Sequence, residues 1–202
     1  MNITPIEALC PSFGDLFDLK REMRSFANMS AFEPASFSSV GEKMSIRVGG
    51  ASVDGSFFST LQSSPALGRA IEPTDDQPGH NHVVVISHPL WQSMFGGSNH
   101  VLGKTLRLNG SSYQIIGVMP PAFAYPHETD FPPGVLGDIG RTDVWVPLAL
   151  SPRQKADRDN FYANVIARLR PGVSIQGAQA EMSTLMVQLD LLHKGDLRGW
   201  GA

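Results

Sequence analysis

Two aspartates and two histidines lie in one stretch rich in glycine and proline: Asp75, Asp76, His80 and His82. Imidazole and carboxylate groups are ligands of zinc and manganese, and a metal-bound water could support hydrolysis. Such a site needs ligands that are preorganised in space, usually with a further partner that orients each imidazole. A loop of this composition does not supply that, so we interpret the stretch as solvated, with the aspartates capping helices or facing water.

No nucleophile stands in a distinctive setting. Cys10 is the only cysteine, so an intrachain disulfide is excluded, and no activating partner is indicated beside it. No serine occurs in a G-x-S-x-G pattern. The glycine pairs Gly49-Gly50 and Gly96-Gly97 match neither the dinucleotide-binding nor the P-loop pattern. We therefore predict no catalytic, cofactor-binding or metal-ligating residues, and a protein that is not an enzyme.

Composition excludes nucleic acid as a partner. The chain has 202 residues with a formal charge of -3, whereas a nucleic-acid footprint requires a clustered basic face. The cluster of Lys20, Arg21 and Arg24 is interspersed with Asp18 and Glu22, which indicates a solvated helix face. No run approaches the roughly 20 apolar residues of a transmembrane helix, and the N-terminus lacks a signal-peptide pattern.

A β-hairpin is the clearest local element. Asn109-Gly110 suits a two-residue type I′ turn, because both positions tolerate positive φ. Counting outward pairs Leu108 with Ser111 and Leu106 with Tyr113. Side chains alternate along a strand, so one face carries Leu106, Leu108, Tyr113 and Ile115. Pro120-Pro121 ends the second strand.

Helical spacing predicts four helices. Ser12 caps an amphipathic helix that includes Phe26, a short helix covers 55–61, and His88-Pro89 opens a helix that Gly96-Gly97 ends. The longest follows Ser174 and runs over 175–193. Its predicted inward positions are Ile175, Ala178, Met182, Leu185, Leu189 and Leu192.

Strands are predicted at 27–40, 44–48, 83–86, 144–148 and 162–169. The apolar run 83–86 indicates a strand buried on both faces. Because it contains Pro147, the strand at 144–148 is expected near a sheet edge, where Trp145 could contact a partner. The proline- and glycine-rich segment 119–142 is expected to be an irregular loop.

Several short segments also occur in a fixed order. They are Val53-Asp-Gly-Ser-Phe-Phe-Ser-Thr-Leu61, Ala66-Leu-Gly-Arg69, Asp75-Asp-Gln-Pro-Gly79, Val83-Val-Val-Ile-Ser87, Leu90-Trp91, Phe95-Gly-Gly97, Gly103-Lys-Thr-Leu-Arg-Leu-Asn-Gly110, Val144-Trp-Val-Pro-Leu148, Asn164-Val-Ile-Ala-Arg-Leu-Arg-Pro-Gly172 and Ala178-Gln-Ala-Glu-Met182. In this order the chain resembles the MacB-like periplasmic core domain, in the version found in ABC-transporter-type permeases of soil bacteria. The resemblance covers residues 12–202.

The resemblance implies an α+β fold in which a porter-like βαβ subdomain is interrupted by a smaller inserted α/β subdomain. Carried over to this chain, the porter-like subdomain comprises 1–54 and 155–202, and the insertion comprises 55–154. The family's first porter strand is not recognisable in residues 1–11, and the final strand begins at Gly199 and breaks off within 199–202. An incomplete sheet edge would favour pairing with another chain.

The resemblance further implies a non-catalytic periplasmic domain of a permease, anchored in the bacterial inner membrane by flanking transmembrane helices that this chain lacks. Such a domain couples transmembrane motion, driven by an ATPase subunit or domain, to substrate export or extracytoplasmic partners. The implied partners are a second copy and, in some relatives, a periplasmic adaptor protein. Two alternatives stay open: a free-standing small-molecule-binding module and a metal-dependent hydrolase using His80 and His82.

Overall fold

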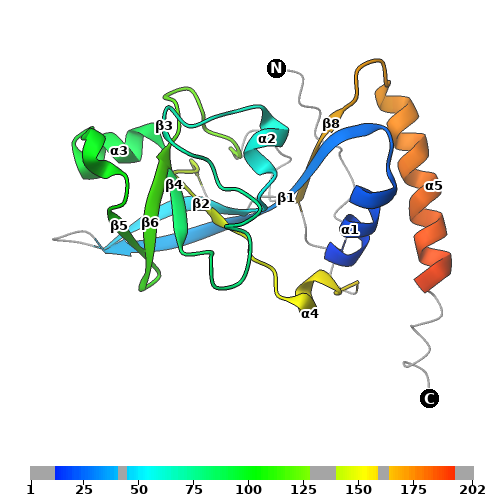
Figure 1. The fold of residues 1–202 in the computed structure, drawn as a ribbon, viewed down its shortest axis with the longest axis horizontal. Helices are drawn as coiled ribbons and strands as arrows, with labels where there is room; N and C mark the ends of the chain where they lie inside the picture. Colours follow the sequence, from blue (N-terminus) through cyan, green and yellow to red (C-terminus); the bar gives the residue numbers. More distant parts are fainter. Residues whose placement is uncertain (1–11, 41–44, 128–139, 159–163, 194–202) are drawn as a thin grey trace.

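The computed structural model describes residues 12–40, 45–127, 140–158 and 164–193 (Figure 1). The helices are α1 (Phe13–Glu22), α2 (Phe57–Leu61), α3 (His88–Phe95), the 3-10 turn η1 (Asn99–Val101), α4 (Pro152–Lys155) and α5 (Ile175–His193). The strands are β1 (Phe26–Val40), β2 (Ser45–Val53), β3 (Leu67–Gly68), β4 (Val83–Ile86), β5 (Thr105–Leu108), β6 (Ser111–Val118), β7 (Val144–Pro147) and β8 (Asn164–Leu169). Within these ranges, no helix combines the length and apolar character needed to cross a bilayer.

Six strands close into a ring, which we call the barrel. Its order is β1-β2-β7-β4-β6-β5, and a single residue pair, Ser39 with Leu108, returns β5 to β1. The β2–β7 and β4–β6 pairs are parallel and the other pairs are antiparallel. The short strand β3 pairs with β6. This mixed sheet with helices confirms the predicted α+β class.

The barrel interior is filled by apolar side chains from every strand of the ring. They include Phe37, Val48, Val84, Leu106, Leu108, Ile115, Val144 and Val146, with Leu90 of α3. A second cluster occupies the opposite face of β1, β2, β4 and β7, where α2 packs. It includes Phe32, Val53, Phe57, Phe58 and Trp145. Burial on both faces explains the uninterrupted apolar run in β4.

The strand β1 extends beyond the barrel. Its first half pairs with β8, from Phe26 opposite Leu169 to Phe32 opposite Asn164, and its second half pairs with β2. Helices α1 and α5 cover one face of the β1–β8 pair (Figure 1). The resulting core includes Phe13, Leu16, Leu19, Met29, Ala178, Met182 and Leu189. We call α1, the first half of β1, β8 and α5 the helix-covered unit.

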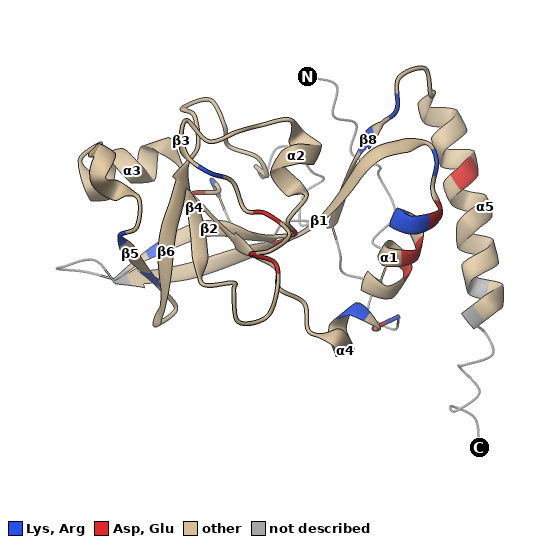
Figure 2. Ribbon diagram, viewed as in Figure 1, with Lys and Arg blue, Asp and Glu red and all other residues tan. Residues whose placement is uncertain are grey.

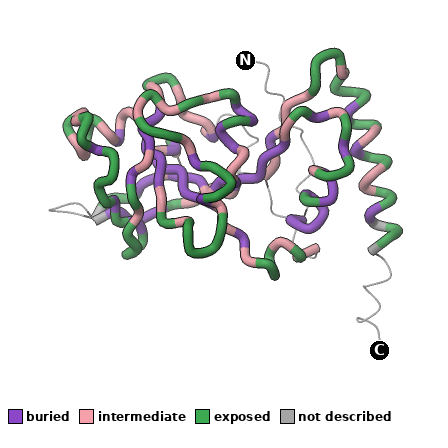
Figure 3. The backbone as a smooth tube through the Cα atoms, viewed as in Figure 1, coloured by how far each residue is buried: buried purple, intermediate pink, exposed green. Residues whose placement is uncertain are grey.

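The long helix α5 has the predicted bounds, and the Ser174 hydroxyl accepts a hydrogen bond from the Gly177 amide. Its inward positions were predicted only in part. Ala178, Met182 and Leu189 are buried, whereas Ile175 is 38% exposed and Leu192 is 73% exposed. The outer face of α5 is largely exposed (Figure 3). The helix therefore contacts the sheet through its central turns and not through its full length.

The first helix begins as predicted but ends earlier. The Ser12 hydroxyl accepts from the Asp15 amide, which confirms the cap. The chain becomes extended at Met23, and Phe26 is the first residue of β1, so its assignment to the helix was wrong. Phe26 reaches the same core from a strand, which is why its spacing suggested a helix.

The hairpin is confirmed in register and turn geometry. Leu106 pairs with Tyr113 and Leu108 with Ser111, and both turn residues have positive φ, 50° at Asn109 and 84° at Gly110. The Asn109 side chain also accepts from the Ser38 amide. This contact ties the hairpin turn to the end of β1, where the ring closes.

The predicted edge position of the strand at 144–148 was wrong. Strand β7 lies between β2 and β4, and Trp145 is fully buried, with its indole nitrogen donating to the Tyr125 carbonyl. Pro147 is the last residue of β7, opposite Val53, so its missing N–H does not interrupt the ladder. Trp145 is a core residue and offers no surface to a partner.

Some predicted features lie outside the described residues: 1–11, the link 41–43, part of the loop 119–142, residues 162–163 and the segment from 194. The predicted second strand was too short, since β2 continues to Val53. The division into 1–54 with 155–202 and 55–154 stays a prediction.

Candidate functional site at the junction of the barrel and the helix-covered unit

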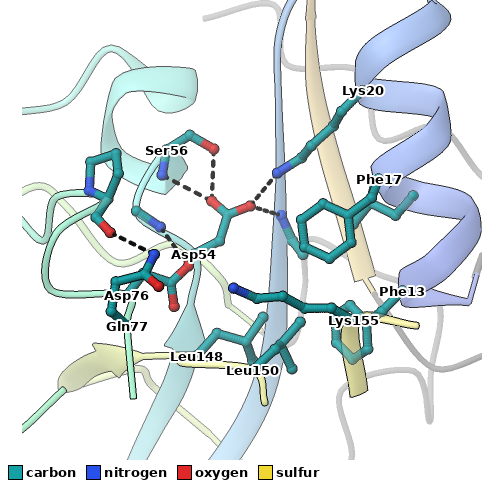
Figure 4. A pocket seen from close by; sticks show the side chains of 14 residues that line it. Phe13, Phe17, Lys20, Asp54, Ser56, Asp76, Gln77, Leu148, Leu150 and Lys155 are labelled. Carbon is teal, nitrogen blue, oxygen red and sulfur yellow. Dashed lines mark hydrogen bonds and ion pairs between the residues drawn. The ribbon is translucent and has the colours of Figure 1, made fainter. Parts of the chain in front are cut away.

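One buried carboxylate connects several elements at the junction. Asp54 follows β2 directly and accepts a hydrogen bond from Lys20 of α1 at 2.5 Å (Figure 4). Its oxygens also accept from the Ser30 hydroxyl at 2.6 Å and the Ala31 amide at 2.9 Å, both on β1. The amide and hydroxyl of Ser56, which precedes α2, complete the set. Asp54 therefore links α1, β1 and the start of α2.

The environment keeps Asp54 ionised. Burial alone would raise the pKa of this carboxyl, but the Lys20 charge and the hydrogen bonds from Lys20, Ser30 and Ala31 outweigh it. The pKa of Asp54 is therefore lowered. A buried charge satisfied by this many donors holds its neighbours in one arrangement.

A second polar link joins α1 to the segment after α4. Arg158 donates to Asp15 at 2.8 Å and to Asp18 at 2.6 Å, and Arg21 pairs with Asp18 from the exposed side. Burial alone would raise the pKa of Asp18. The charges and hydrogen bonds of Arg158 and Arg21 have the larger, opposite effect, so the pKa of Asp18 is lowered. Charged residues of both signs lie along α1 and near this segment (Figure 2).

The backbone of α1 also lies close to the segment after α4. The Gly14 amide donates to the Asp157 carbonyl at 2.9 Å. A Cβ at position 14 would lie 2.8 Å from Cγ of Arg158. The first turn of α1 thus needs glycine for the approach of this segment.

A hollow of about 200 Å³ opens between α1, the 73–77 loop and the segment that leads into α4. Phe13, Phe17, Leu148 and Leu150 form much of its apolar wall. The polar groups are Lys20, Asp54, Ser56, Asp76, Gln77 and Lys155 (Figure 4). The hollow is thus lined by residues of both the barrel and the helix-covered unit.

Asp76 is a second acid in the lining of this hollow. Its carboxylate accepts from the amides of Ala149, at 2.5 Å, and Gly55, at 3.3 Å. Burial, with a contribution from the Asp54 charge, raises the pKa of Asp76. Two neighbouring acids therefore have pKa values displaced in opposite directions.

A match over most of the chain assigns its family. Residues 10–185 match the model of the MacB-like periplasmic core domain. The chain belongs to this family. No curated protein sequence matches it.

Solved structures share the fold of this MacB-like domain. The extracellular domain of the noncanonic ABC-type transporter YknZ from Gram-positive bacteria superposes with a TM-score of 0.63 at 13% identity, over 95% of this chain and 92% of that one. The periplasmic region of MacB from Actinobacillus actinomycetemcomitans gives 0.61 at 17%, over 94% and 76%. A domain assigned to a permease protein from Porphyromonas gingivalis gives 0.65 at 19%, over 91% and 77%.

Membership places the chain among the periplasmic domains of ABC transporter permeases and implies an extracytoplasmic location. The fold agrees, since the MacB periplasmic region has the same mixed α+β architecture.

In this MacB-like domain the candidate metal-like cluster of Asp75, Asp76, His80 and His82 does not converge. Asp75 is buried and accepts from Arg69 at 2.6 and 2.9 Å, whereas His80 and His82 are exposed. In the part of the chain that the structure describes, no three His, Cys, Asp or Glu side chains are placed to share a metal ion. These aspartates were expected to cap helices or to face water; in the structure Asp75 binds Arg69 and the Glu72 amide, and Asp76 accepts from the amides of Gly55 and Ala149.

Sequence reasoning missed the junction. Lys20 was assigned to a solvated face, yet it pairs with Asp54, whereas Arg21 and Arg24 are exposed as predicted. A partial signal existed, since an aspartate after a strand with a serine two residues later favours a side-chain-capped turn. Nothing local identified Lys20, 34 residues away, as the partner.

Proposed function

We propose that this chain is the non-catalytic coupling domain of a MacB-like ABC transporter permease, anchored by transmembrane helices that flank it in the full-length protein. Its partners would be those helices, an ATPase subunit or domain, and a second copy of the permease. Motion driven by ATP hydrolysis would pass through the domain to support export or to act on an extracytoplasmic adaptor. The observation that carries the proposal is the family match over residues 10–185.

The architecture supports transmission of a displacement. Strand β1 is 15 residues long and belongs to both the barrel and the helix-covered unit. The pair of Lys20 with Asp54 connects α1 to the barrel, and Arg158 connects α1 to the chain that leaves it. With these links the two parts would move as one body when the membrane helices shift α5.

Distance measurements in the full-length permease test this proposal. Spin labels at Leu102→Cys in the barrel and Leu192→Cys on α5, both exposed, report the separation of the two parts, with Cys10 replaced by serine. We expect ATP turnover to change the distance between the two copies' labels at 102 while the distance from 102 to 192 within a chain stays constant.

Two variants sharpen the measurement. Lys20→Met removes the charged link at the junction and should broaden the distance from 102 to 192. Arg141→Met removes a barrel ion pair to Asp143, away from the junction, and should leave that distance unchanged. The coupling role is refuted when turnover moves the barrel independently of α5 or does not move it at all.

A further inference from the structure

The hollow at the junction contains one basic side chain without a bonded partner. Lys155 is the last residue of α4, whose start is fixed by a capping box between Ser151 and Gln154. Within the described residues, the Lys155 ammonium group makes no hydrogen bond and no ion pair; it extends across the hollow toward the acids (Figure 4), and its charge acts on Asp76. The other lysine of the lining, Lys20, is bound to Asp54.

The acids of the hollow are already satisfied by the protein. Asp54 accepts from Lys20, from two hydroxyls and from backbone amides. Asp76 accepts from two backbone amides; burial raises its pKa, and the charge of Lys155 lowers it in part. Protein donors thus already bind the carboxylate oxygens of both acids, whereas the N–H groups of the Lys155 ammonium are available to an anionic acceptor.

The opposite side of the hollow is apolar and partly open. Phe17 projects from α1 with 39% of its surface exposed, although it is a large aromatic residue. Leu148 and Leu150 lie on the facing segment. A short apolar chain placed here would cover surface that the protein leaves in contact with water.

We propose that this hollow binds a small organic anion with a short apolar chain. The anionic group pairs with the Lys155 ammonium, and the chain lies against Phe17 and Leu148. Pockets for small ligands combine such an apolar wall with few polar groups that set the orientation. Because Phe17 lies on α1 and Lys155 on α4, the ligand contacts both sides of the junction.

Titration calorimetry of the 202-residue chain with octanoate tests the site, and octylammonium is the probe of opposite charge. We expect saturable binding of octanoate and none of octylammonium. Lys155→Met keeps most of the side-chain length but removes the charge, and should weaken octanoate binding at least about tenfold. Phe17→Ala should weaken it several-fold.

Lys104→Met is the matched control, because Lys104 is exposed and outside the lining of the hollow. It should bind octanoate like the unaltered chain. Circular dichroism verifies that each variant is folded, and Lys155→Gln serves if the methionine variant is not. No saturable octanoate binding, equal binding of both probes, or binding that both Lys155 variants leave intact would overturn the proposal.

Discussion

The barrel and the helix-covered unit bury their apolar side chains in different ways. In the barrel every strand of the ring has a neighbour on each side, and side chains from all six strands meet inside. The helix-covered unit has only the β1–β8 pair, with two helices on one face, and much of α5 stays exposed. Closure of the ring gives the barrel a core enclosed on all sides. The stability of the helix-covered unit depends in addition on the continuity of β1 with the barrel and on polar links to it.

The links between them are mostly charged. Lys20, Asp54 and Arg158 make directional contacts that hold an arrangement without requiring a large apolar interface. The comparison therefore leads to an ordering: substitutions of buried side chains on the barrel strands should cost the most, those within the helix-covered unit less, and those at the junction or a hairpin turn least.

The largest effect is expected at Trp145. Trp145→Ala removes a fully buried indole that contacts Phe58 and Phe123, and should lower the free energy of unfolding by about 3–5 kcal/mol. Urea unfolding followed by circular dichroism measures it. Trp145→Phe, which keeps much of the ring, should cost less. A loss below about 1 kcal/mol for the alanine variant would contradict tight packing in the cluster between the barrel strands and α2.

Two leucines of α5 compare its faces. Leu189→Ala removes a buried side chain and should lower the free energy of unfolding by about 2 kcal/mol. Leu192→Ala alters a side chain that is 73% exposed and should change it by less than about 0.5 kcal/mol. Equal losses in the two variants would mean that the helix contacts the sheet through a different face.

The junction pair gives a pH-dependent effect. The lowered pKa of Asp54 means that its contribution to stability is present above the pKa of the unfolded chain and is lost as pH falls through the folded value. Lys20→Met should lower the free energy of unfolding by about 1–3 kcal/mol near neutral pH. The difference from the unaltered chain should shrink in acid, where Asp54 becomes protonated.

Unfolding curves at several pH values measure this difference, with Lys104→Met as the control that changes little. A difference of the same size in acid and at neutral pH would show that the Lys20 stem, and not its charge, is responsible.

The smallest effect is expected at the hairpin turn. Gly110 has φ of 84°, and a Cβ there would meet nothing within 4 Å, so Gly110→Ala tests backbone strain alone. We expect a loss of about 1 kcal/mol in thermal or urea unfolding. Ser111→Ala, one residue further, should be nearly neutral. A neutral Gly110→Ala would show that the turn does not limit the barrel's stability.

Local patterns predicted what local physics controls. The Asn109-Gly110 turn, the Ser12 cap, the Gly96 stop and the α5 bounds follow from backbone preferences within a few residues, and all are present. The ordered segments from Val53 onward likewise supported the family assignment, which the match over 10–185 shows.

Tertiary structure decided the rest. Closure of the barrel, the central place of β7 and the Lys20–Asp54 pair each join residues far apart in the chain. Pattern and turn chemistry specify which face of a strand is apolar, but not which strand lies beside it, because that depends on packing summed over the whole core. The hollow beside Lys155 exists only because α1 and the end of β7 meet there.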